Sequence, residues 1–130
     1  MMIDSSVLIA ILENEPEAIA DDPVHLISAV SVVETSIVIL NRRGEAGVAE
    51  LDAFLQKAGI ETVAVTPEQA TLARQAYERY GRGRHPAKLN FGDCFSYAAA
   101  VAHDEPLLFK GNDFGETDVV CCIDWKNNRV

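Results

Sequence analysis

The hydrophobic residues of this 130-residue chain fall into two alternating patterns. Short apolar runs have the length and alternation of β-strands, and longer segments place apolar residues at the spacing of helices. Strands are predicted at residues 2–3, 24–28, 60–65, 106–109 and 119–123. Helices are predicted at residues 7–12, 31–43, 45–58, 67–80 and 91–103, with residues 13–23 as a short acidic helix or turn. Strands separated by helices are typical of a three-layer α/β/α sandwich around a mainly parallel sheet.

Several boundaries carry residues with known preferences for helix ends. Gly44 is a typical stop for the apolar helix before it. Thr66 is the expected N-cap of the helix predicted at residues 67–80, with Pro67 at its first position. Residues 81–90 (GRGRHPAKLN) form a loop rich in glycine and basic residues. Because no repeat or linker interrupts this pattern, we expect one domain over residues 1–130.

Composition limits the classes of protein that this chain can represent. Hydrophobic residues make up 48% of the chain, which is enough for the core of one domain. No stretch approaches the roughly 18 apolar residues of a membrane helix, and the N-terminal segment lacks the basic leader of a signal peptide. Three cysteines, an odd number, do not make a disulfide framework. We therefore expect a protein of the reducing cytoplasm with no membrane partner.

The formal net charge of −9 is unusual for a protein that binds nucleic acid through phosphates alone. Acidic balance usually serves solubility, and it becomes informative only where the acids cluster on one surface. The basic residues concentrate before the last long helix, where a solvated loop and a contact with RNA phosphates both stay open as interpretations. They are Arg79, Arg82, Arg84, His85 and Lys88.

Four acidic residues lie at junctions between predicted elements. Asp4 follows the first strand, Glu34 lies in the first turn of the helix after the second strand, Asp93 opens the alanine-rich helix, and Asp113 follows the strand 106–109. Strand C-termini and helix N-termini share one edge of a parallel sheet, and open α/β folds bind ligands there. We therefore expect the four acids to converge.

Each acid also has a purely structural explanation. Asp4 and Asp113 are suited to helix capping, Glu34 has capping-box spacing from Ser31, and Asp93 suits the positive end of a helix dipole. However, Glu34 and Asp93 lie within apolar segments, where an ionised carboxylate is costly unless it is paired or liganded. Two carboxylates about 5 Å apart repel by roughly 3 kcal/mol at an effective dielectric near 20. An all-oxygen cluster of this kind suits Mg²⁺ or Mn²⁺ rather than zinc.

The segments MMIDSSVLIAIL, SVVE, LNFGDCFSYAAA and LLFKGNDF resemble the PIN-domain ribonucleases, specifically the VapC toxins of type II VapBC toxin–antitoxin systems. The resemblance covers nearly the whole chain, in the order and spacing of that family. It implies a PIN-like fold and a Mg²⁺- or Mn²⁺-dependent endoribonuclease that forms a homodimer and is neutralised by a cognate antitoxin. The acids of the family map onto Asp4, Glu34, Asp93 and Asp113, and its hydroxyl near the first acid maps onto Ser6.

The expected chemistry is RNA hydrolysis by water that a metal activates, since a bound metal lowers the pKa of water. Asp4 and Asp93 would hold a metal directly, Glu34 would complete the site, and Asp113 would position a second metal or a water. Lys110 is a further candidate for contact with the substrate, or simply a charge at a strand end. The candidate substrates are tRNA and other structured RNAs.

Two other functions stay open at this point. The chain also shares features with phosphohydrolases of the haloacid-dehalogenase kind. These features are an acid after the first strand, Lys110 at a strand end, and acids at positions 113 and 118. That chemistry normally needs a second acid two residues after the nucleophile, where Ser6 stands, and it leaves Glu34 unexplained. The third interpretation is a non-catalytic binding module on the same fold, because a sequence does not show turnover.

Overall fold

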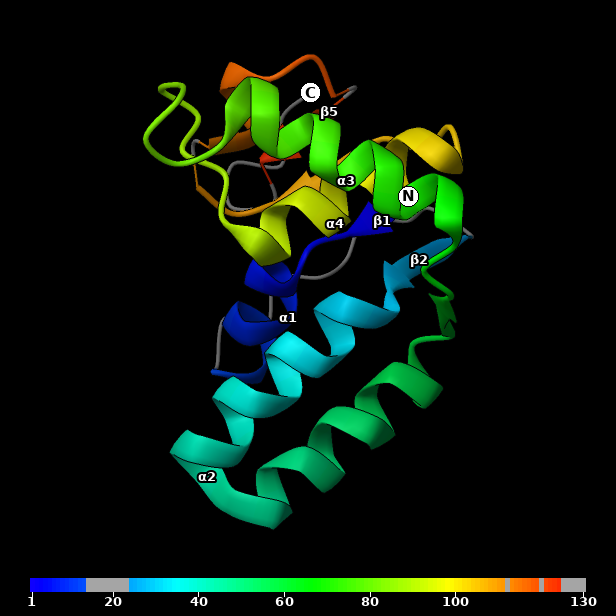
Figure 1. Cartoon of the computed structure of the whole chain (residues 1–130). Helices are drawn as coiled ribbons and strands as arrows, with labels where there is room; N and C mark the ends of the chain where they lie inside the picture. Colours follow the sequence, from blue (N-terminus) through cyan, green and yellow to red (C-terminus); the bar gives the residue numbers. More distant parts are fainter. Residues whose placement is uncertain (14–23, 112, 120, 125–130) are drawn as a thin grey trace.

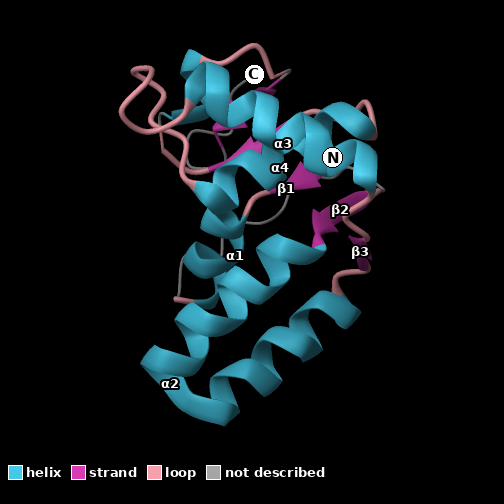
Figure 2. Cartoon of the chain, in the orientation of Figure 1, coloured by secondary structure: helices cyan, strands magenta, loops and turns pink. Residues whose placement is uncertain are grey.

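A computed structural model describes residues 1–13, 24–111, 113–119 and 121–124 (Figures 1 and 2). The strands are β1 (Met2–Ile3), β2 (His25–Ser28), β3 (Ile60–Val63), β4 (Leu107–Phe109) and β5 (Cys121–Asp124). The helices are α1 (Ser5–Leu12), α2 (Ala29–Lys57), α3 (Pro67–Tyr80), α4 (Phe91–Ala102) and the short 3-10 helix η1 (Asp113–Glu116). Of the predicted acidic segment, Glu13 is in a turn, and residues 14–23 lie outside the described residues.

The five strands form one parallel sheet in the order β3-β2-β1-β4-β5. Successive strand residues face opposite sides, so Met2 contributes to one hydrophobic core and Ile3 to the other. The first core lies under α3 and α4 and the second under α1 and α2, and Figure 1 shows these helix pairs on opposite sides of the strands. The predicted three-layer sandwich is therefore confirmed.

Helix α2 contains two helical segments that meet at Gly44. This glycine has φ 68° and ψ −164°, a backbone conformation that L residues with side chains rarely adopt. The chain reverses there, and Figure 1 shows the two segments side by side and antiparallel. A Cβ at Gly47 would lie 2.8 Å from Cγ2 of Ile39, so this close contact depends on a second glycine. The helix stop that the sequence predicts at Gly44 is confirmed.

The start of α2 differs from the prediction by two residues. Ser28 is the N-cap, and its hydroxyl accepts a hydrogen bond from the Val30 amide. Ser31, from which the helix was predicted to start, is instead fully buried inside its first turns. The capping box predicted between Ser31 and Glu34 is therefore wrong.

The other boundaries follow local hydrogen bonding. Thr66 caps α3 by accepting from the Gln69 amide, with Pro67 at the first position, as predicted. The last strand starts at Cys121 rather than at Val119, because the Val119 amide donates to the hydroxyl of Thr117 in a turn. Among the described residues, no helix combines the length and apolar character that crossing a bilayer would need.

From the sequence, the helices at residues 45–58 and 67–80 carry more apolar residues than one face against the sheet requires, and this surplus predicts a homodimer. In the structure these residues are mostly used within one chain. Leu51, Ala76 and Tyr80 are buried, and Phe54, Leu55 and Leu72 pack against the cores. Of that set, Tyr77 is exposed. The sequence-based argument for a dimer through these residues is therefore wrong, and the exposed apolar residues lie elsewhere. They are Val24, Val33, Ile37, Leu40, Val65, Tyr77, Phe91 and Val101.

Candidate active site

Asp4 is the buried acid at the end of the central strand. It is the N-cap of α1, and its carboxylate accepts hydrogen bonds from the Ser6 amide at 3.0 Å and from the Ser96 hydroxyl at 2.5 Å. Only 3% of the residue is exposed. The capping interpretation is thus confirmed, but capping uses one carboxylate oxygen and the other oxygen faces α4.

A chain of two serines stands behind Asp4. The Ser96 hydroxyl lies 3.1 Å from the hydroxyl of Ser31, and both serines are fully buried. A hydroxyl has one proton, and Ser96 gives that proton to Asp4. Ser31 must therefore be the donor of the second bond. The result is a directed chain from α2 through α4 to the Asp4 carboxylate.

Glu34 lies in the second turn of α2, half-buried, and its carboxylate faces the start of α4. The Ser5 hydroxyl donates to Oε1 of Glu34 at 2.6 Å. A Cβ built at Gly92 would lie 2.1 Å from Oε2 of Glu34, so a residue with a side chain at this position would displace the carboxylate. The glycine therefore allows Glu34 to reach the first turn of α4.

Asp93 is the third residue of α4 and forms a capping box with Asn90. The Asp93 amide donates to the Asn90 side chain at 2.9 Å, and the Asn90 amide donates to the Asp93 carboxylate at 3.0 Å. The acid thus interacts with the positive end of the helix, as its structural explanation requires. It also stands next to Gly92, against which Glu34 packs.

Three acids therefore gather around the first turns of α4. Asp4 reaches this helix through Ser96, Glu34 reaches it through Gly92, and Asp93 belongs to it. Asp113 begins η1, directly after β4. In the described part of the chain, no three acidic, histidine or cysteine side chains are arranged around a single metal position. The carboxylates of Asp4, Glu34 and Asp93 each accept a hydrogen bond from a protein donor.

The donor chemistry of the site fits a hard divalent cation. Carboxylates and hydroxyls supply only oxygen, which Mg²⁺ and Mn²⁺ prefer. Neither Asp4 nor Glu34 forms an ion pair with a described lysine or arginine. Two carboxylates that have no basic partner among the described residues can share a cation between them.

Two supporting residues of the sequence prediction lie beside this cluster. The Ser6 hydroxyl accepts a hydrogen bond from the Lys110 amide at 3.0 Å, so it links α1 to the end of β4. The neighbouring Ser5 was not selected from the sequence, but its hydroxyl donates to the Glu34 carboxylate. Sequence reasoning also missed Ser31, Ser96 and Gly92. These three residues could have been identified from the sequence as small polar residues, or a glycine, inside otherwise apolar helices.

Cys94 is next to Asp93 but is not suited to act as a nucleophile. Burial, and then the negative charge of Asp93, raise the pKa of its thiol to about 11. The thiol therefore stays protonated near neutral pH, whereas the thiolate is the reactive form. Its side chain packs in the core under α3 and α4, which is the role that its small size beside Asp93 favours from the sequence.

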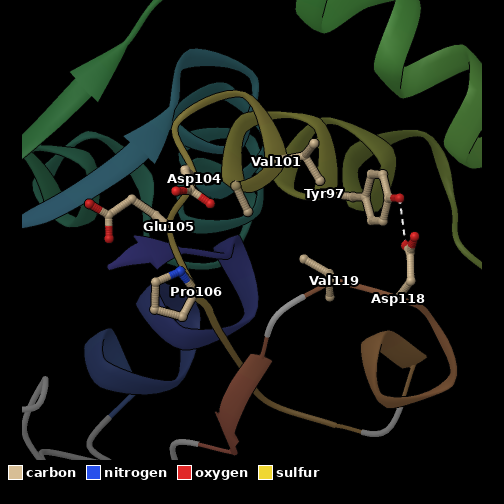
Figure 3. Close-up of a pocket in the computed structure, with 8 residues that line it drawn as sticks. Tyr97, Val101, Asp104, Glu105, Pro106, Asp118 and Val119 are labelled. Atoms are coloured by element: carbon tan, nitrogen blue, oxygen red, sulfur yellow. Dashed lines mark hydrogen bonds between the residues drawn. The ribbon is translucent and has the colours of Figure 1, made fainter.

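A separate pocket lies at the opposite end of α4 (Figure 3). The Tyr97 hydroxyl donates to Asp118 at 2.6 Å, and Arg79 lies 3.5 Å from the same carboxylate. The hydrogen bond from Tyr97 is the main cause that lowers the pKa of Asp118, and burial together with this contact raises the pKa of Tyr97. Asp118 therefore belongs to a local pair and not to the cluster of acids.

Comparison with known proteins identifies relatives over nearly the whole chain. Residues 1–120 match the sequence model of the PIN domain. A "Ribonuclease VapC" of Mycolicibacterium smegmatis is 54% identical over 125 residues, which cover 92% of this chain and 97% of that protein. "Ribonuclease VapC30" of Mycobacterium tuberculosis is 49% identical, with 92% and 95% covered.

Solved structures share the fold at low sequence identity. Mycobacterium tuberculosis VapC20, described as a "Sarcin-Ricin loop cleaving toxin", superposes with a TM-score of 0.74 at 17% identity, over 92% of this chain and 95% of that one. VapBC-1 from nontypeable Haemophilus influenzae gives a TM-score of 0.72 at 14% identity, with 96% and 97% covered. At these identities the structures establish the fold alone.

Proposed function

This chain belongs to the PIN-domain family, and we propose that it acts as a metal-dependent endoribonuclease, the toxin of a toxin–antitoxin pair. The ribonuclease relatives at up to 54% identity support this activity. The observation that carries it is the buried Asp4 carboxylate, held by two donors beside α4, where Glu34 and Asp93 also lie. An RNA substrate and a toxin role place the proposed activity in the cytoplasm.

We propose that Asp4, Glu34 and Asp93 hold Mg²⁺ or Mn²⁺, with Asp113 as the fourth acid. Such a metal, when bound, would neutralise the carboxylates and stabilise the charge that develops on the phosphate. The serines orient the acids: Ser96 fixes one oxygen of Asp4, and Ser5 fixes one oxygen of Glu34.

The proposed protein partners are a cognate antitoxin and a second copy of this chain. Structural neighbours include a complex described as a "Toxin-antitoxin complex from Klebsiella pneumoniae", with a TM-score of 0.69. An apolar surface for protein contacts is available on α2 and at the start of α4, where Val33, Ile37, Leu40 and Phe91 are exposed. Phe91 is 73% exposed although it borders the groove that Glu34 lines.

The phosphohydrolase alternative loses one of its residues in the folded chain. It drew on an acid at position 118, but Asp118 pairs with Tyr97 and Arg79 and not with the cluster of Asp4, Glu34 and Asp93. The non-catalytic alternative differs from our proposal in one respect, because it predicts that the protein does not cleave RNA.

The test is a cleavage assay on a panel of structured RNAs that includes tRNA. With Mg²⁺ or Mn²⁺ the protein should cut single-stranded or loop regions, because there the backbone is accessible. Chelator should stop the reaction, and zinc should substitute poorly. Asp4→Asn, Asp93→Asn and Glu34→Gln should each reduce the rate by orders of magnitude, without additivity, because they act as one unit.

Glu61→Gln is the matched control, since it removes an exposed carboxylate on the edge strand β3. Expression without a partner should arrest growth, and Asp4→Asn should not. Equal cleavage by wild type and Asp4→Asn would identify a contaminating nuclease. Absence of both cleavage and growth arrest would favour the non-catalytic module.

A further inference from the structure

The loop between α3 and α4, residues 81–90, is held in one conformation by its own hydrogen bonds. Its two ends form a parallel bridge, in which the Arg82 amide donates to the Leu89 carbonyl at 3.0 Å and the Leu89 amide donates to the Tyr80 carbonyl at 2.9 Å. Two buried residues, Ala87 and Leu89, fix it to the core. The loop is therefore a platform that is fixed to the core at these points, and most of its other residues are exposed.

His85 belongs to the framework of this loop. Its Nδ1 accepts a hydrogen bond from the Ala87 amide at 3.0 Å, and its ring packs edge-on against Tyr80 at 5.0 Å. The two arginines that precede it, Arg82 and Arg84, are exposed, as is Lys88 after it. The framework thus presents three cations to solvent.

The two arginines of this loop differ from the other described arginines. Four of the six described arginines form ion pairs with acids: Arg42 with Glu13, Arg43 with Glu50, Arg74 with Glu78 and Arg79 with Asp118. Among the described residues, the two arginines that form none are Arg82 and Arg84. The loop also contains no acid. In a chain of net charge −9, positive potential is therefore concentrated here.

The loop leads directly into the cluster of acids. Its last residue, Asn90, caps α4 and binds Asp93. Lys88 is five residues before Asp93, a chain distance of at most about 18 Å. A strand of RNA that crosses the loop would therefore need only a few nucleotides to reach the acids.

We infer that Arg82, Arg84 and Lys88 form the site that binds the RNA backbone next to the acids. The inference rests on the proposed function and adds the element that an acidic endoribonuclease needs. The acids repel phosphates, whereas the exposed cations of this loop attract them without reading bases. A platform that is already ordered loses little conformational entropy on binding.

The test compares two triple variants of equal charge. Arg82→Gln, Arg84→Gln and Lys88→Gln remove the loop cations, whereas Arg42→Gln, Arg74→Gln and Lys57→Gln remove three cations elsewhere. Both sets are made in the Asp4→Asn protein with Mg²⁺. Affinity for a short fluorescein-labelled single-stranded RNA is measured by anisotropy across a range of salt concentrations, and cleavage is measured in the same sets with Asp4 restored.

The loop variant should lose more than about tenfold in affinity at physiological ionic strength. The slope of log affinity against log salt should fall by about two units, since each phosphate contact on a single strand contributes about 0.7. With Asp4 restored, the loss should appear in KM and leave kcat nearly unchanged. The control variant should bind RNA like its parent.

Unchanged affinity and slope in the loop variant, with cleavage by the wild type intact, would overturn the inference. The same would hold if the loop variant kept its RNA affinity and lost only binding to the purified antitoxin, because the loop would then be a protein surface. If the wild type cleaves no RNA but loop-dependent RNA binding persists, the proposed function fails and the inferred RNA site stands.

Discussion

At the scale of single residues, the orientation of the Asp4 carboxylate depends on hydroxyl groups that are not among the proposed metal ligands. Ser96→Ala removes the donor at 2.5 Å and leaves one oxygen of a buried carboxylate without its partner. We expect Mn²⁺ affinity to fall by about 10- to 100-fold, the usual effect of groups that orient metal ligands. Calorimetric titration measures this change directly.

Two further variants separate orientation from simple destabilisation. Ser31→Ala should weaken Mn²⁺ binding less than Ser96→Ala and should add nothing in the Ser96→Ala background, since Ser31 acts through Ser96. Ser36→Ala removes a hydroxyl of the same helix that bonds only to the Val32 carbonyl, and it should bind Mn²⁺ like the wild type. Additive losses from the first two variants would contradict the directed chain.

Asp118 should make stability depend on pH in acid. The hydrogen bond from Tyr97 lowers the pKa of this carboxyl below its ordinary value of 3.8 in the folded chain. The stabilisation is therefore complete above the ordinary value and disappears as pH falls through the lowered pKa. Because Asp118 is half-exposed, its contribution stays below about 1 kcal/mol.

The measurement is the difference in Tm between wild type and Asp118→Asn as a function of pH. This difference in Tm should be largest near neutral pH and should fall toward zero as the pH becomes acidic. Tyr97→Phe should show the same trend because it removes the donor. A Tm difference that stays constant from neutral pH into acid would show that the contact does not favour the ionised carboxylate.

The residues that sequence reasoning could identify were the ones with a charge. Glu34 and Asp93 were found because a carboxylate in an apolar segment is costly without a partner. Ser96 carries no such penalty, and its partner Asp4 is 92 positions away in the chain. The contact is created by packing between α4 and the end of β1, which no local pattern specifies.

At the scale of elements, the first turn of α4 combines a helix cap with the acidic site, and Asp93 serves both. Asp93→Asn keeps an oxygen that accepts from the Asn90 amide, whereas Asp93→Ala loses it. Both changes should abolish metal binding, but only the alanine should cost about 1 kcal/mol of stability. Chemical denaturation without metal, followed by Mn²⁺ titration, separates the two roles. Equal loss of stability in both variants would contradict the capping role.

Element boundaries were predictable where the determining residue is local. Gly44 ends a helical segment through its own backbone conformation, and Thr66 caps a helix through its own side chain. Both boundaries can therefore be predicted from the residue type alone. The start of α2 was not predictable, because Ser28 and Ser31 are both suitable caps by residue type. Burial of Ser31 against Ser96 selects Ser28.

At the scale of the whole molecule, the alternation of strands and helices was sufficient to predict three layers, because a parallel sheet needs helices on both faces. Which apolar residues remain outside the cores was not predictable. Leu51 and Phe54 were expected to be surplus, but the chain reversal at Gly44 folds their segment back onto α1 and the first half of α2. Only tertiary packing reveals that the exposed stripe lies on the other half of α2.

That stripe is the basis of a prediction about assembly. Val33, Ile37 and Leu40 are 57%, 54% and 48% exposed, and their spacing places them on one face of α2. Light scattering at micromolar concentration should give twice the chain mass of 14.2 kDa, as the proposed homodimer requires. Ile37→Lys should return the mass to that of one chain, because it places a charge in the middle of the apolar face. Val101→Lys, at an exposed apolar position on α4, should not change the mass. A single-chain mass for the wild type at high micromolar concentration would exclude the homodimer and leave the stripe to the antitoxin.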